Sequence, residues 1–200
     1  IGRDGDVTEH EVRRTVAAYY ANIEDNDTRY GRVLDALRKA NEDPDEWIII
    51  YTTDHGEMMG EHGVWEKQKF FEASARVPLI IRWPKGFKGG RRVTENVNLC
   101  DIFATLCELC DIPLPDGTDS RSLVPLLNGD SSGWSNETIS QFRGTNLMIK
   151  QNHLKYQYYG EDMPEVLFDL EKDPNEMKSF MDDHAYADHI EKFRKRRGEL

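Results

Sequence analysis

Asp54, His55 and Lys67 bring a carboxylate, an imidazole and an ammonium group into one short stretch of the chain. A carboxylate oxygen suits a hard cation such as calcium, whereas imidazole is more typical of zinc or manganese, so the residue types alone leave the metal open. A lysine ammonium is a compact positive charge that can lie against an anionic oxygen and oppose charge that builds as a bond breaks. These residues therefore indicate a site for a metal ion and an anion.

Simpler roles compete with each of these assignments. In an isolated Asp-His pair, Asp54 more often caps a helix and His55 is a hydrogen-bonded loop histidine. Lys67 could be a solvated surface lysine, which is the role expected for Lys69. His62 could donate a proton to a leaving group or touch a substrate, but it lies in a glycine-flanked loop and a structural role is equally open.

The position of the Asp-His pair favours the metal site. Residues 47–51 form a continuous apolar run, which is typical of a parallel strand covered on both faces. Asp54 and His55 follow the carboxyl end of this run, where ligands bind in open α/β sheets, and Gly56 leaves the backbone free to turn there.

The stretch from Asp54 to Lys67, with residues 71–81 after it, resembles the sulfatase family. Similarity to further sulfatase stretches, in the same order, extends to residues 30–37, 122–129 and 167–176. The resemblance implies that Asp54 and His55 are two of the family's four calcium ligands and that Lys67 contacts the sulfate. It implies a sulfuric ester hydrolase of the alkaline phosphatase superfamily, whose partner is a small-molecule or glycan sulfate ester.

One part of the family pattern does not occur in this sequence. Sulfatases carry a Cys or Ser in a Cys/Ser-x-Pro/Ala-x-Arg motif, which is oxidised to formylglycine, and none of the cysteines and serines here begins that motif. We therefore expect the chain to be the C-terminal portion of a longer enzyme. The formylglycine and the other two calcium ligands are expected in the preceding part, and the chain alone is expected to be inactive toward aryl sulfates.

Two alternatives stay open. A phosphonate or phosphate ester hydrolase of the same superfamily would use a metal ion and Lys67 equally well on tetrahedral phosphorus. A non-catalytic module would fold and bind a metal or a partner without turnover. The sequence specifies neither the substrate nor the choice between sulfate and phosphate.

The composition limits the other partners. The 200 residues are 38% hydrophobic, which is ordinary for a globular protein, and carry a formal net charge of −11. This negative charge argues against nucleic acid and an anionic membrane surface, because phosphate binding relies on a basic face. No apolar run approaches the roughly eighteen residues of a transmembrane helix. The resemblance slightly favours a periplasmic or secreted location, and exposed apolar surface could support a homo-oligomer.

A long helix is predicted near the N-terminus. Thr8 and Glu11 fit a capping box at its start, and apolar residues then recur at steps of three and four up to about Lys39. Residues 41–46 are expected to end this helix, because Pro44 lacks a backbone donor and biases the residue before it out of helical geometry.

Two domains are predicted in an α/β protein. Strands at residues 47–51 and 77–82 place residues 1–128 in the C-terminal part of an α/β catalytic domain, with a mixed, mainly parallel sheet flanked by helices. Residues 129–200 are predicted to form a smaller α+β subdomain. Its antiparallel sheet is expected from four short strands, followed by a C-terminal helix, at residues 138–142, 145–150, 153–159, 166–170 and 184–197.

Several other polar residues are given structural roles. The basic residues of the C-terminal helix are expected to form a solvated face. Asp169, Asp173 and Glu176 fit turn and cap positions. An odd number of cysteines does not indicate a disulfide framework, and Cys100, Cys107 and Cys110 are expected to pack as small apolar side chains rather than to bind metal or act in redox chemistry.

Overall fold

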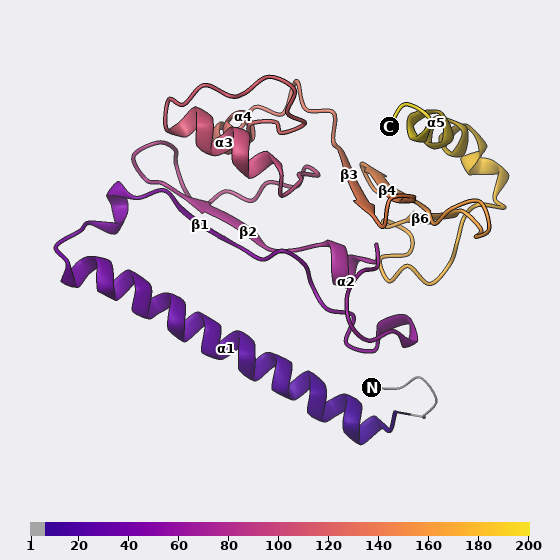
Figure 1. Ribbon diagram of the computed structural model, residues 1–200, viewed down its shortest axis with the longest axis horizontal. Helices are drawn as coiled ribbons and strands as arrows, with labels where there is room; N and C mark the ends of the chain where they lie inside the picture. The colour runs from indigo at the N-terminus through magenta and orange to yellow at the C-terminus, as the bar shows by residue number, and fades with distance from the viewer. Residues whose placement is uncertain (1–6) are drawn as a thin grey trace. The chain divides into compact units, whose positions relative to one another are not determined.

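The computed structural model describes residues 7–200 and divides into two compact units, one ending at Gly89 and one running from Gly90 to Leu200 (Figure 1). Each unit is described by itself. The predicted boundary at residue 128 concerns the domains of a longer protein and stays a prediction.

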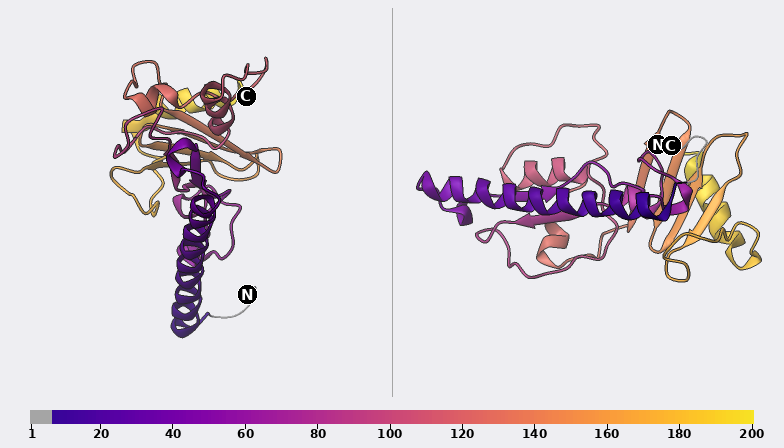
Figure 2. Two further views of the ribbon diagram at one scale, coloured as in Figure 1. Left: turned by 90° about the vertical axis from the view of Figure 1, so that its left-hand side faces the viewer. Right: turned by 90° about the horizontal axis from the view of Figure 1, so that it is seen from below.

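The first unit begins with α1 (Glu9–Lys39), a helix of 31 residues that runs without a break (Figure 2). Its start is the predicted capping box, because the Thr8 hydroxyl accepts from the Glu11 amide at 3.3 Å and the Glu11 carboxylate accepts from the Thr8 amide at 2.9 Å. None of the α1 residues, all of which the structure describes, is buried. The predicted apolar residues are present, but Tyr20 and Val33 are exposed.

A two-stranded sheet follows α1 and the short helix η1 (Pro44–Glu46). Strand β1 (Ile49–Thr52) pairs with β2 (Leu79–Arg82) in antiparallel register, with Ile50 opposite Ile81. The expectation of a parallel strand covered on both faces is therefore not met in the described part of the chain. Every β1 residue is only half-buried. The apolar run predicted the strand but not its direction, which depends on where the chain returns.

The connection between β1 and β2 contains only single-turn helices. These are η2 (Glu61–Gly63) and α2 (Glu72–Ala75). A parallel neighbour needs a crossover connection, most often a helix that packs across the sheet. This connection instead returns the chain beside β1 in the opposite direction, and it carries all the candidate site residues.

The second unit opens with two helices, α3 (Asp101–Leu109) and α4 (Val124–Asn128). Cys107 on α3 is buried, as predicted for a small apolar side chain, whereas Cys100 and Cys110 are exposed. All three are free thiols. The predicted packing role therefore holds for Cys107 alone.

Four antiparallel strands in the order β3-β4-β5-β6 confirm the predicted sheet. They are β3 (Glu137–Phe142), β4 (Asn146–Gln151), β5 (Leu154–Tyr158) and β6 (Val166–Asp169). Alternate residues of these strands place large apolar side chains on one face, because successive side chains of a strand point to opposite sides. The buried set on that face includes Leu147, Ile149, Leu154, Tyr156 and Leu167.

The predicted C-terminal helix is present, and it covers this face. The short helix η3 (His184–Tyr186) leads into α5 (Ala187–Arg197), which lies along the sheet (Figure 2). Ile190 and Phe193 join the core, and the Phe193 ring stacks on Tyr156 with centroids 5.5 Å apart. This sandwich of sheet and helix is the main apolar core of the second unit.

The basic residues of α5 do more than form a solvated face. Arg194 and Arg197 both bind the Glu165 carboxylate, Arg197 at 2.6 Å, and Arg196 binds Glu137 at 3.1 Å. Arg194 is exposed, as predicted, but Arg196 and Arg197 are half-buried. The prediction was wrong for these two, because their partners lie on the sheet or near it and are distant in sequence. Those ion pairs fasten the helix to β3 and to the segment that leads into β6, which are the two edge strands of the sheet.

Candidate functional site

The Asp54–His55 pair lies directly after the carboxyl end of β1, as predicted from the sequence. The Oδ2 atom of Asp54 and the Nε2 atom of His55 are 3.4 Å apart. The Asp54 side chain is 82% exposed and that of His55 40% exposed, so both can be reached from outside the unit. Two ligands at right angles on one cation, each about 2.4 Å from it, would also lie about 3.4 Å apart.

A backbone contact orients the imidazole. Nδ1 of His55 lies 2.8 Å from the carbonyl oxygen of Gly56, which can only accept a hydrogen bond. This contact requires a proton on Nδ1, so in the neutral imidazole the lone pair of Nε2 faces Asp54. Metal-binding histidines are usually held in this way by an acceptor on the other ring nitrogen.

The Asp54 carboxylate is stabilised in its charged form. Burial raises the pKa of Asp54, but hydrogen bonds from the backbone and from Thr53, together with the nearby His55, bring the pKa below its ordinary value. The Oδ1 atom accepts from the His55 amide at 3.0 Å. Oδ1 is thus engaged within the turn, and Oδ2 is the oxygen that faces the imidazole.

Gly56 seats this turn against α2. Its amide donates to the Ser74 carbonyl at 2.8 Å, and a Cβ at this position would lie 2.0 Å from the Ala73 carbonyl oxygen. Only glycine allows so close an approach. The sequence indicated that Gly56 frees the backbone to turn, but it gave no sign of the contact with α2.

The described residues supply no third His, Cys, Asp or Glu side chain to this pair. Among them, no group of three or more His, Cys, Asp or Glu side chains is arranged to hold a metal ion. Calcium takes six to eight oxygen ligands, so Asp54 and His55 can make only part of its coordination sphere. The donor set fits a shared metal site and not a complete one.

The segment that leads from this turn to Lys67 folds back on itself. The Met58 amide donates to the Glu66 carbonyl at 2.9 Å, and the Gly60 amide donates to the Val64 carbonyl at 3.0 Å. Met58 is fully buried at the base of this loop. Lys67 follows as an exposed residue, and so does Lys69. Burial therefore does not distinguish Lys67 from Lys69, and only their positions in the sequence do.

His62 lies at the tip of this loop, within η2. Its ring stacks on that of Phe71, with centroids 3.9 Å apart and planes 10° from parallel. The contact that the structure shows for this ring is made through its face.

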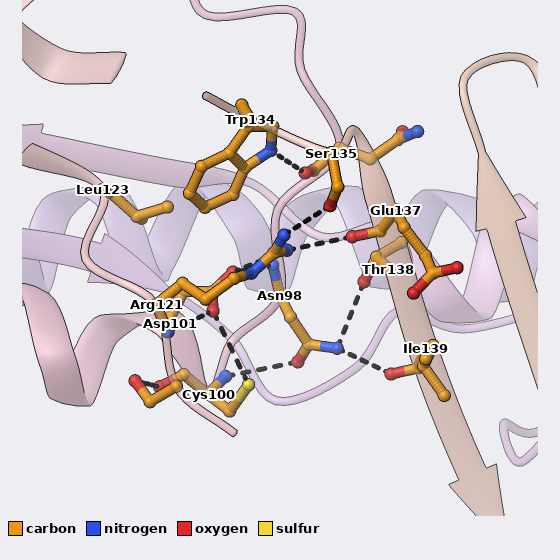
Figure 3. A network of polar contacts seen from close by, with 12 residues as sticks. Asn98, Cys100, Asp101, Arg121, Leu123, Trp134, Ser135, Glu137, Thr138 and Ile139 are labelled. Atoms are coloured by element: carbon orange, nitrogen blue, oxygen red, sulfur yellow. Dashed lines mark hydrogen bonds and ion pairs between the residues drawn. The ribbon is translucent and has the colours of Figure 1, made fainter. Parts of the chain in front are cut away.

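A separate polar network in the second unit fixes α3 to β3 (Figure 3). Asp101 is 1% exposed and accepts from the backbone amides of Asn98 and Arg121, each at 2.9 Å. The Asn98 side chain donates to the hydroxyl of Thr138 at 3.1 Å and to the carbonyl of Ile139 at 2.7 Å. This network was not predicted, because its members lie about 40 residues apart.

Arg121 completes the network. Its guanidinium lies 4.1 Å from the centre of the Trp134 ring and donates to the Ser135 hydroxyl at 2.7 Å and the Glu137 carbonyl at 2.9 Å (Figure 3). Since the arginine donors are bound within the unit, its role is structural.

The late acidic residues have structural roles of two kinds. Asp169 accepts from the amides of Glu171 and Lys172 at 3.1 and 3.2 Å, which confirms the predicted turn role. Glu176 was expected in a similar role, but it is buried and its carboxylate lies 2.8 Å from the ammonium of buried Lys155. That partner lies on β5, and no local pattern identifies it.

Two family models match the chain. The model described as "Sulfatase" matches residues 3–112, and the model described as "N-sulphoglucosamine sulphohydrolase, C-terminal" matches residues 60–200. The curated relatives include a choline-sulfatase of Rhizobium meliloti (strain 1021), 40% identical over 180 residues, and arylsulfatase K of Homo sapiens, 35% identical over 190 residues. Each match covers 86% of this chain and 34% of the relative, so the chain spans about a third of their length.

A solved structure shares the fold. The phosphonate monoester hydrolase of Agrobacterium radiobacter is similar to the chain with a TM-score of 0.85 and 32% sequence identity. The match covers 99% of this chain and 44% of that chain.

Proposed function

Because this chain belongs to the sulfatase family, we propose that it is the C-terminal portion of a sulfuric ester hydrolase and carries half of that enzyme's metal and sulfate site. The spacing of Asp54 and His55 is the observation that carries the proposal. The 3.4 Å separation and the hydrogen-bonded Nδ1 leave one oxygen and one nitrogen lone pair side by side, as two ligands of one cation require.

The cation is proposed to be calcium. The Asp54 carboxylate is a hard ligand that stays charged at neutral pH, since its pKa is lowered. Bound there, calcium would withdraw charge from an ester oxygen as a Lewis acid. The two further ligands and a formylglycine nucleophile are proposed to come from a preceding part of a longer protein.

Lys67 is proposed to contact the sulfate. Lys67 is exposed and follows the loop that starts at the turn formed by residues 54–56, the metal turn. Its ammonium is therefore free to approach an anion. Its charge would oppose the negative charge that builds on the sulfuryl oxygens. His62, considered from the sequence as a proton donor, stacks on Phe71 through the face of its ring.

The substrate class is a small-molecule or glycan sulfate ester. The related proteins named for choline sulfate, aryl sulfate and N-sulphoglucosamine support this range without selecting within it. The helices that the structure describes include none with both the length and the apolar composition of a membrane span. A periplasmic or secreted location and a homo-oligomer remain predictions for the full-length protein.

The test uses the full-length protein on matched aryl sulfate and aryl phosphate esters, with and without calcium. Sulfate release should depend on calcium and should fall strongly in Asp54→Asn and Lys67→Ala. Lys69→Ala is the matched control and should retain activity, because Lys69 matches no part of the family motif. Full activity in both Asp54→Asn and Lys67→Ala would contradict the assignment of the site.

A phosphonate or phosphate ester hydrolase is the second candidate. The similarity to the phosphonate monoester hydrolase, at 32% identity over nearly the whole chain, is the observation that favours it. A preference for the phosphate ester in the same assay would select this candidate. Calcium binding without turnover of either ester would instead indicate a non-catalytic module.

A further inference from the structure

The loop between the metal turn and Lys67 has an unusual backbone. Three residues other than glycine adopt positive φ angles there, Met59 at 53°, His62 at 53° and Glu66 at 78°, and Gln68, directly after Lys67, does so at 72°. L-residues disfavour this region, and they persist in it only where the surrounding structure holds them. Glu66 and Gln68 flank Lys67 directly. The direction of the Lys67 side chain therefore depends on whatever holds this loop.

The ring of His62 makes a contact that fixes this loop. It lies face to face with the Phe71 ring, 3.9 Å between centroids, from the other end of the segment that contains Lys67. The stack closes the chain between residues 62 and 71, so the Lys67 segment is fixed at both ends.

Phe71 connects the stack to the metal turn. It is the N-cap residue of α2, and its carbonyl accepts from the amides of Ser74 and Ala75 at 3.0 and 2.8 Å. The Ser74 carbonyl in turn accepts from the Gly56 amide at 2.8 Å, beside Asp54 and His55. A continuous set of contacts thus runs from the His62 ring through α2 to the candidate metal ligands.

We propose that His62 is a positioning residue: its stack on Phe71 fixes the strained loop against α2 and so sets where Lys67 stands relative to Asp54 and His55. The proposal rests on the function proposed above for Lys67. A positioning role differs from a chemical role in the atoms that it needs. Stacking requires only the ring face, whereas proton transfer or a hydrogen bond to substrate requires a ring nitrogen.

Two variants separate these roles. His62→Phe keeps an aromatic face and removes both ring nitrogens. His62→Asn removes the face but retains a residue type that tolerates positive φ. His10→Asn, at an exposed position in the first turn of α1, is the matched control for loss of an imidazole.

In the full-length protein, we expect His62→Asn to lower kcat/KM by about 10- to 100-fold, as for other residues that orient a site without touching the reacting atoms. His62→Phe should restore most of this loss, and its pH profile should match that of the wild type. Equal loss in His62→Phe and His62→Asn, with amide exchange in His62→Phe as in the wild type, would overturn the proposal, because the loop would then be intact and the ring nitrogens would be the groups that are missing. Wild-type kcat/KM in His62→Asn would also overturn it.

Amide hydrogen exchange gives a readout that needs no turnover. His62→Asn should speed exchange at the Gly56 and Met58 amides, while His62→Phe and His10→Asn should leave it unchanged. Unchanged exchange in His62→Asn would refute the link to the metal turn. If the wild type turns over neither ester, the proposed function fails, and the exchange measurement still decides the role of His62.

Discussion

Lys155 and Glu176 form an ion pair inside the second unit, with Nζ 2.8 Å from Oε1 and side-chain exposures of 0% and 3%. The pair joins the middle of β5 to the loop that follows β6. Burying two charges costs free energy that their attraction must offset, so the pair is tolerated only while both partners are present.

Breaking this pair should destabilise the chain strongly. Glu176→Gln is expected to lower the free energy of unfolding by about 3–5 kcal/mol, because it removes the carboxylate charge that faces the buried Lys155 ammonium. Chemical denaturation followed by circular dichroism measures the change. The double variant Lys155→Met, Glu176→Leu should recover most of the loss, and a larger loss in the double variant would contradict this account.

Gly56→Ala should disturb the metal turn. The new Cβ would lie 2.0 Å from the Ala73 carbonyl oxygen, which belongs to the backbone and cannot rotate away. We expect a loss of about 1–3 kcal/mol in stability, as for other overpacked sites, and weaker calcium binding by calorimetry in the full-length protein. Gly31→Ala is the control, since nothing lies within 4 Å of its Cβ and alanine favours the helix.

Asp101→Asn should weaken the connection between α3 and β3. The carboxylate accepts from two backbone amides, and an asparagine would turn an NH₂ group toward one of these donors. The expected cost is about 1–3 kcal/mol, the range for a buried donor left without an acceptor. Thermal unfolding measures it. Asp119→Asn, at an exposed position nearby, should leave the stability unchanged. An equal loss of stability in Asp119→Asn would argue for a general effect of removing a negative charge.

Acid should destabilise the second unit through Glu165. Burial raises the pKa of this carboxyl, but hydrogen bonds from Arg194 and Tyr156 outweigh burial and lower the pKa below its ordinary value of 4.5. A lowered folded-state pKa contributes stability that is present above pH 4.5 and is lost as the pH falls through the folded-state value. Glu165→Gln should be less stable than wild type at pH 7, and the difference should shrink below pH 4.5. A difference that is constant with pH would contradict the prediction.

The sequence predicted the features that depend on local patterns. The capping box at Thr8, the strand before Asp54 and the antiparallel strands of the second unit all follow from residue periodicity and turn residues. The position of Asp54 and His55 at the end of β1 followed from the same run of apolar residues. Their roles stay predictions, as do those of Lys67 and His62.

The remaining features depend on which distant segments meet. The antiparallel pairing of β1 with β2 is set by the path of a long connection, not by the apolar run itself. Lys155 and Glu176 lie 21 residues apart on different elements, and neither shows in sequence that its charge will be buried. The same holds for Arg196 on α5, whose partner Glu137 begins β3. Long-range polar contacts leave no periodic signal.

Helix α1 has 31 residues, and none of them is buried. Heat capacity rises on unfolding mainly because apolar surface becomes hydrated, so a helix whose apolar side chains already meet water adds little to that rise. Helices that lack tertiary packing also melt gradually, because their stability then rests on local propensity. Calorimetry of this chain should therefore resolve a broad transition from α1, with a small heat-capacity increment, apart from the cooperative transition of the sheet covered by α5.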